Sequence, residues 1–145
     1  MNDTEFMRIA IEESKRGDWP YGAVIVKDGA IVARGFNTST RESDTTAHAE
    51  VNVIRAALRV VPDLSLKGCT LYTSSEPCPM CAGAIIWAGL SRVVFGASIQ
   101  ELIDVGQPQI KTSSQAIIKT AFIDIELTGG VLAAEALQVV RNWSR

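Results

Sequence analysis

The only histidine of the 145-residue chain, His48, stands two positions before Glu50 and well ahead of the pair Cys78 and Cys81. One neutral imidazole and two thiolates form a ligand set for zinc, and three protein ligands leave the fourth tetrahedral position open for water. Zinc lowers the pKa of bound water to about 7, so a hydroxide nucleophile becomes available at neutral pH. The fold must therefore bring His48 beside Cys78 and Cys81, and we expect one zinc ion per chain.

These residues stand at the starts of two predicted helices. Apolar residues at helical spacing predict a helix over residues 47–60, with Thr45 or Thr46 available as its cap. A second helix is predicted over residues 79–89, where Pro79 suits the first turn because its missing N–H needs no partner there. The unpaired N–H groups and partial positive charge of helix starts favour thiolates and hydroxide. We therefore expect both helix N-termini to meet at the metal.

Helices and strands alternate along the rest of the chain. Helices are also expected over residues 3–16, 113–121 and 131–143, and strands over residues 23–26, 30–33, 69–73, 92–96 and 122–127. An Asp-Gly turn joins the first two strands as a hairpin. This alternation is typical of an α/β fold. The length, with 47% hydrophobic residues, predicts a single domain over residues 1–145.

Several segments between residues 21 and 97 match a known family. They read YGAVIV from Tyr21, TAHAEV from Thr46, LYTSSEPCPMCAGAI from Leu71 and FGA from Phe95, with Asn37 between the first two. This stretch resembles the cytidine and deoxycytidylate deaminase superfamily of zinc enzymes, and within it the guanine deaminase and tRNA adenosine deaminase branches. The resemblance implies a three-layer α/β/α sandwich around a five-stranded mixed sheet. It also implies an oligomer, which we expect to be a homodimer.

The candidate site residues have distinct expected roles. Glu50 would close the metal site if it bound zinc, so its best role is general base and then general acid. In the reaction that the resemblance implies, water attacks a ring carbon bearing an exocyclic amine, and ammonia leaves. The resemblance assigns substrate binding to Asn37 and to the backbone N–H of Ala49, and it places Trp87 beside the pocket. Asn37 could instead shape a turn, and Trp87 could instead pack in the core or in a dimer contact.

Cysteine usage leaves two other kinds of site open. A structural zinc site would use Cys69 as a fourth ligand, and a thiol oxidoreductase would use Cys78 and Cys81 as a redox pair. Neither gives Glu50 a role, and we expect Cys69 to be a small buried hydrophobe. The chain has no run of 18 apolar residues and no signal-peptide pattern at its start, so we expect a cytoplasmic protein with no membrane contact.

The charge pattern bears on the substrate. The net charge is −2 and the basic residues are scattered, which argues against a large nucleic-acid partner. The last predicted helix is nearly neutral, whereas tRNA deaminases usually end in a basic helix. Residues 98–121 also lack the aromatic and acidic segment of guanine deaminases. We therefore expect a free small-molecule nucleobase, namely guanine, isocytosine or a similar 2-amino-4-oxo base, or cytosine. The alternative is adenosine in tRNA.

Overall fold

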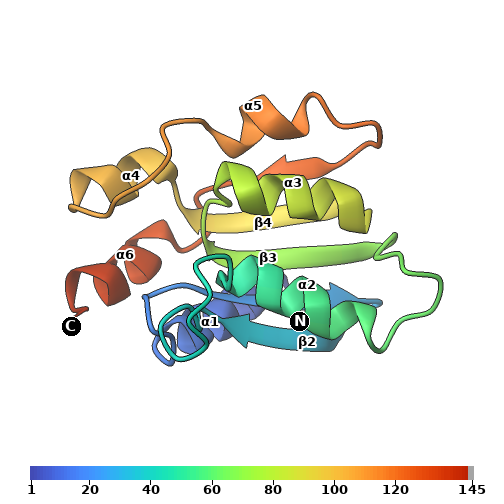
Figure 1. Cartoon of the computed structure of the whole chain (residues 1–145), viewed down its shortest axis with the longest axis horizontal. Helices are drawn as coiled ribbons and strands as arrows, with labels where there is room; N and C mark the ends of the chain where they lie inside the picture. Colours follow the sequence, from blue (N-terminus) through green and yellow to red (C-terminus); the bar gives the residue numbers. More distant parts are fainter. Residues whose placement is uncertain (144–145) are drawn as a thin grey trace.

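The computed structural model describes residues 1–143, and five strands in this part of the chain form one sheet (Figure 1). The strands are β1 (Gly22–Lys27), β2 (Ala30–Phe36), β3 (Cys69–Ser75), β4 (Arg92–Ala97) and β5 (Glu126–Thr128). Their order across the sheet is β2-β1-β3-β4-β5. β1 runs antiparallel to β2 and β3, whereas β4 runs parallel to both β3 and β5. The expected five-stranded mixed sheet is confirmed.

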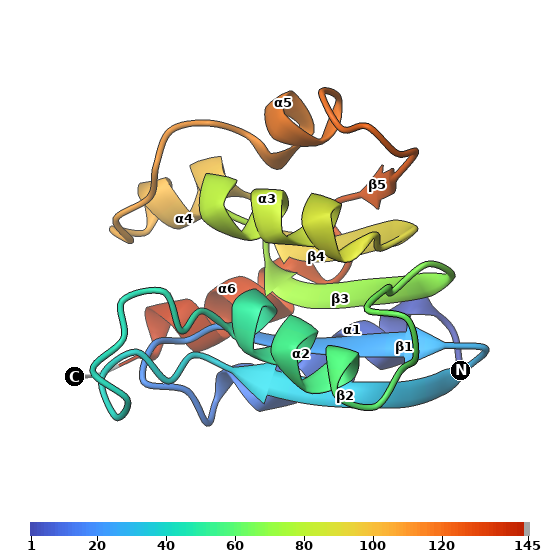
Figure 2. The same ribbon diagram turned by 45° about the vertical axis from the view of Figure 1, so that its right-hand side comes forward.

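Helices cover both faces of this sheet. They are α1 (Asp3–Ser14), α2 (Ala49–Leu58), α3 (Pro79–Ala88), α4 (Ile99–Asp104), α5 (Ser114–Ile118) and α6 (Ala133–Arg141). α1 and α6 pack on one face, and α2 and α3 pack on the other (Figure 2). α5 lies against α3, outside the sheet. The three layers of an α/β/α sandwich are therefore present.

Alternate residues of β1 supply the two halves of the core. Val24 and Val26 pack toward α1 and α6, whereas Ala23 and Ile25 pack toward α2, as the two-residue period of a strand requires. α1 lies so close to the start of β1 that a Cβ atom on Gly22 would stand 2.4 Å from a carbonyl oxygen of α1. Glycine at this position therefore serves the packing of α1 and fixes where β1 begins.

α2 begins in a different way from the prediction. Its N-cap residue is His48, where Thr45 or Thr46 is expected, and no side chain caps the helix. The N–H and hydroxyl of Thr46 instead donate to the Asp44 carboxylate, at 2.9 and 2.6 Å. Aspartate commonly forms such local turns with the residue two positions ahead. The capping prediction was wrong because this turn competes for the threonine.

The last third of the chain departs furthest from the expected elements. α4 has no counterpart among the predicted helices, although Ser98 and Glu101 form a complete capping box at its start. β5 begins at Glu126 and so covers only the end of the strand predicted over residues 122–127. α6 begins after residue 131 because Leu132 has a left-handed backbone conformation, with φ of 55°. Within residues 1–143, no helix has both the length and the apolar character needed to cross a bilayer.

Candidate active site

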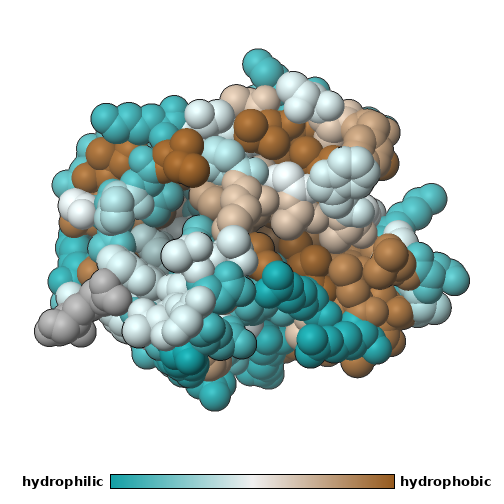
Figure 3. Space-filling model, in the orientation of Figure 1, coloured by the Kyte–Doolittle hydropathy of each residue, from teal (hydrophilic) through white to brown (hydrophobic). Residues whose placement is uncertain are grey.

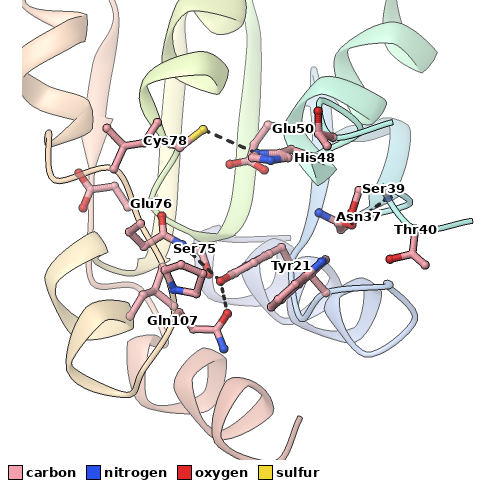
Figure 4. A pocket seen from close by; sticks show the side chains of 16 residues that line it. Tyr21, Asn37, Ser39, Thr40, His48, Glu50, Ser75, Glu76, Cys78 and Gln107 are labelled. Atoms are coloured by element: carbon pink, nitrogen blue, oxygen red, sulfur yellow. Dashed lines mark hydrogen bonds between the residues drawn. The ribbon is translucent and has the colours of Figure 1, made fainter. Parts of the chain in front are cut away.

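Two helix starts and the end of β3 converge on the predicted ligands. His48 is the N-cap residue of α2, and Cys78 is the N-cap residue of α3. Cys81 lies in the first turn of α3, where Pro79 occupies a position that needs no N–H partner. Because the side chains stand at helix starts, the local positive end of each helix faces the same point. Figure 4 shows His48 and Cys78 approaching one another from the two helices.

The three ligand atoms have the spacing of a zinc site. His48 Nδ1 lies 3.6 Å from Cys78 Sγ and 3.6 Å from Cys81 Sγ. All three atoms lie within 4.8 Å of one another. Tetrahedral zinc with ordinary bond lengths separates a nitrogen and a sulfur ligand by about 3.6 Å. The cluster contains His48, Cys78 and Cys81 but not Cys69, which is buried at the start of β3. Cys69 therefore does not supply the fourth ligand that a structural zinc site would need.

The electrostatics of the cluster also fit a cation. A hydrogen bond from Cys81, assisted by His48, lowers the pKa of the Cys78 thiol to about 4. The same hydrogen bond and burial raise the pKa of the Cys81 thiol. The contact with Cys78 raises the pKa of His48. Cys78 is thus stable as a thiolate beside these groups, whereas Cys81 would need a cation nearby to become a thiolate as well. Zinc meets this need because it deprotonates the thiols that coordinate it.

Glu50 lies beside the ligand cluster without belonging to it. It is in the first turn of α2, and only 6% of its surface is exposed. Burial, followed by the nearby Cys78 thiolate, raises the pKa of its carboxyl group to about 7. A general acid–base group works best when its pKa is close to the working pH. Glu50 thus combines a buried position beside the ligand cluster with a pKa near neutral.

A cavity of about 450 Å³ opens beside these residues. Its lining includes His48, Glu50 and Cys78 at one end. The segment 107–110 supplies part of the opposite wall. Among the described residues, no lysine or arginine lines the cavity. A volume of this size suits a small organic ligand.

Asn37 lines the same cavity in a fixed orientation. It is 3% exposed, and its Oδ1 accepts hydrogen bonds from the N–H and the hydroxyl of Ser39, at 3.0 and 2.8 Å. Because Oδ1 is occupied by two donors, the amide nitrogen is the part of Asn37 left to donate, and Figure 4 shows it directed into the cavity. Ala49 is the first residue of α2, so its backbone N–H has no acceptor inside the helix. The structure thus places Asn37 on the cavity and Ala49 in the first turn of α2, next to His48.

Trp87 lies outside the cavity. Its side chain is 80% exposed near the end of α3, and its ring lies 5.2 Å from the ring of Phe122. Cys81 is in the first turn of α3, and a position six residues later faces another direction further along the helix. Within one chain, Trp87 therefore does not have the predicted place beside the substrate. A surface contact is the interpretation that its position supports.

Several cavity residues were not among the predicted site residues. The Tyr21 hydroxyl donates to Gln107 Oε1 at 2.7 Å and accepts from Gln109 Nε2 at 3.3 Å. Glu76 is 8% exposed, and its carboxylate accepts hydrogen bonds from the starts of both α4 and α5. Ser75, at the end of β3, also lines the cavity. The only local signal was the position of Glu76 and Ser75 directly before Pro77 and Cys78.

Comparison with known proteins gives a consistent family. Residues 1–97 match the family described as "Cytidine and deoxycytidylate deaminase zinc-binding region". The guanine deaminase of Bacillus subtilis (strain 168) is 46% identical over 111 residues, covering 73% of this chain and 71% of that protein. The probable cytosine deaminase of Schizosaccharomyces pombe is 35% identical over 144 residues, covering 93% and 88%. A solved structure from a study of A-to-I editing by tRNA:A34 deaminases has 32% identity and a TM-score of 0.80, covering 94% and 99%. The chain belongs to the cytidine and deoxycytidylate deaminase family, and His48, Cys78 and Cys81 form its candidate zinc site.

Proposed function

We propose that the protein is a zinc-dependent hydrolytic deaminase of a free amino-substituted nucleobase such as guanine, isocytosine or cytosine. The observation that carries this proposal is the lining of the cavity, which in residues 1–143 holds neutral polar groups and carboxylates but no cationic side chain. A phosphate-bearing substrate would leave its charges without partners there. Relatives named as guanine deaminase and probable cytosine deaminase support the same substrate class.

The chemistry follows from the placement of Glu50. Zinc held by His48, Cys78 and Cys81 would supply an activated water as the nucleophile when bound. Glu50 accepts a proton from the attacking water and delivers it to the adjacent ring nitrogen of the base. Glu50 then carries the second proton to the departing amine, so that ammonia leaves and an oxo group remains on the ring. A carboxyl group whose pKa is raised by burial toward the working pH is suited to both transfers.

Substrate orientation is assigned to two donors. The Asn37 amide nitrogen lines the cavity, and the Ala49 N–H belongs to the first turn of α2 between His48 and Glu50; we assign both to acceptor atoms of the base. The Asn37 side chain loses little freedom on binding, since two hydrogen bonds from Ser39 within the chain already fix it. This arrangement holds the amine-bearing carbon near Glu50.

We also propose that the protein is a homodimer. Met80, Gly83, Ala84 and Trp87 recur at helical spacing on the outer side of α3, where they are half-buried or exposed. Phe122, 67% exposed, extends this surface beside Trp87. Figure 3 shows hydrophobic residues gathered over α3 and α5. An exposed apolar surface of this kind marks a contact with another protein.

Light scattering tests the dimer. We expect a mass of two 15.6 kDa chains, and Trp87→Asp should shift the protein toward one chain. Val60→Asp is the control, because Val60 is 68% exposed at the far end of α2. A wild-type protein found only at 15.6 kDa would contradict the proposal.

Adenosine in tRNA is the second candidate, because the chain resembles a tRNA:A34 deaminase structure along most of its length. Arg41 directly follows Thr40, which lines the cavity. Its guanidinium is engaged by Asp18, with its Nη2 2.9 Å from Oδ1, and by the carbonyl oxygen of Arg16. It also lies over the Phe36 ring. A guanidinium held by these partners is poorly placed to bind the phosphates that flank a flipped base.

A substrate panel decides between the two candidates. Ammonia release should be measured from guanine, isocytosine and cytosine, and inosine formation in a tRNA anticodon stem-loop. We expect turnover of a free base with little change between 50 and 200 mM salt, whereas a protein that makes about 6–10 phosphate contacts loses roughly 10³–10⁵ in affinity over this range. Efficient inosine formation without ammonia from any free base would reverse the assignment.

A further inference from the structure

We propose that Ser75 is a substrate-contacting residue that determines which base the cavity accepts, through a hydrogen bond from its hydroxyl to the ring. Ser75 is the last residue of β3, it is 5% exposed, and it lines the cavity. Within residues 1–143, its Oγ is one of two buried side-chain polar atoms without a hydrogen-bond partner, the other being Trp143 Nε1. Only Ser75 Oγ belongs to a residue that lines this cavity.

The two preceding hydroxyls, of Thr73 and Ser74, have hydrogen-bond partners, so the lack of a partner is particular to Ser75. The Thr73 hydroxyl donates to the Ser75 carbonyl oxygen at 3.1 Å, and Ser74 Oγ accepts from the Gly22 N–H at 3.1 Å. Folded proteins pair nearly all of their buried polar atoms, so an unpaired one calls for an explanation. Two of three successive hydroxyls are used inside the fold, and the third, on a residue that lines the cavity, has no partner among the described residues.

Ser75 also has the right place for a substrate contact. Successive side chains of a strand point to opposite faces, so Ser75 shares the face of Thr73, toward α2 and α3. Figure 4 shows Ser75 beside Glu76 and across the cavity from Asn37. A base held by Asn37 near Glu50 would therefore meet Ser75 at another edge.

The chemistry of a hydroxyl defines what it selects. Serine can donate one hydrogen bond and accept others, so it suits a ring N–H or an exocyclic oxygen equally well. An analogue that presents a C–H group at this edge would not form this hydrogen bond. Sites built to pair with a polar group reject analogues that lack it. The inference rests on the proposed function for the identity of the ring as a free base.

Ser75→Ala and Ser74→Ala form a matched pair of variants. For Ser75→Ala we expect wild-type zinc content and a urea midpoint at least equal to wild type, because no hydrogen bond within the protein is lost. The KM for the preferred base should rise about 10-fold, the size of one lost neutral hydrogen bond, with a much smaller change in kcat. Ser74→Ala should instead lower the urea midpoint, because the buried Gly22 N–H loses its acceptor.

The outcomes separate this inference from the proposed function. A Ser75→Ala protein with the KM of wild type, or one that loses stability as Ser74→Ala does, overturns the role of Ser75. If the wild-type protein releases ammonia from no free base, the proposed function fails by itself. The tRNA stem-loop then becomes the substrate for the same comparison, and an unchanged KM overturns the inference there as well.

Discussion

Replacing Glu76 with glutamine should loosen the wall of the cavity that faces the metal site. The Glu76 carboxylate accepts from the Ile99 N–H at 2.8 Å, from the Ser114 N–H at 2.8 Å and from the Ser114 hydroxyl at 2.7 Å. Ile99 and Ser114 are the first residues of α4 and α5. The segment between them includes residues 107–110, which line the cavity. One carboxylate therefore holds both ends of this segment against the loop that leads to Cys78.

The structure sets the size of the effect. Glutamine keeps the volume and one oxygen, but its NH₂ group would face the Ser114 N–H, which cannot accept a hydrogen bond. Hydrogen bonds to a charged acceptor contribute about 1.5–3 kcal/mol each, and Ser114 is 1% exposed, so water does not replace them. Glu76→Gln loses the charge and at least one bond, and we expect a loss of about 2–4 kcal/mol.

Urea unfolding of the zinc-saturated proteins measures this loss, and hydrogen exchange of residues 98–121 locates it. Ser113→Ala is the matched control: it removes the α5 cap on the Ala116 N–H, at a cost of about 1 kcal/mol, and leaves Glu76 untouched. We also expect Glu76→Gln to raise KM more than it lowers kcat. A change below about 0.5 kcal/mol, with exchange of residues 98–121 as in wild type, would show that the carboxylate does not anchor the segment.

Three further predictions concern the metal, the proton carrier and acid stability. Metal analysis should find one zinc ion per chain in the wild-type protein and in Cys69→Ser, and none in Cys81→Ala. Loss of zinc in Cys69→Ser would support a site with four protein ligands. Glu50→Gln should keep its zinc and lose about 10²–10⁴-fold in kcat, and near-normal turnover would exclude proton transfer by Glu50. Hydrogen bonds from Arg92 lower the pKa of Asp3 to about 2 in the folded protein, whereas the pKa of an aspartate in the unfolded chain is about 3.9. The Asp3 carboxylate therefore stabilises the folded state above about pH 3.9, and this stabilisation is lost as the pH falls toward 2. For this partly exposed pair we expect Asp3→Asn to cost about 1 kcal/mol at pH 7 in metal-free protein, with the difference from wild type vanishing near pH 2; a difference independent of pH would contradict this.

The metal end of the site could be predicted because it depends on local rules. Cys78 and Cys81 are separated by less than one helical turn, and Pro79 fixes where that turn begins. The helix period also set the position of His48 and Glu50 at the start of α2, even though the capping threonine was wrong. The individual strands and the Asp-Gly hairpin also followed from local signals, whereas the five-stranded mixed sheet was implied by the family resemblance. Local signals place each helix and strand, but they do not by themselves bring His48 to Cys78, 30 positions away.

The far wall of the cavity could not be predicted, because its contacts join distant parts of the chain. Tyr21 and Gln107 are separated by 86 positions, and Glu76 and Ser114 by 38. Neither pair forms a pattern in the sequence, since each is produced by the packing of complete elements. α4 is different: its Ser98–Glu101 capping box was a local signal. The short strand β5 and the position of Trp87 again depended on tertiary packing.

The proposed substrate depends on a part of the cavity that lies beyond the family match. The family match ends at residue 97, so it contains the zinc ligands, Glu50 and Asn37. Gln107 and Gln109 lie beyond it and form the wall that the base would meet opposite the metal. Two neutral amides held by the Tyr21 hydroxyl can pair with the polar edge of a base but cannot neutralise a phosphate. Under the proposed function, this wall and Ser75 together favour a free base over a nucleotide in RNA.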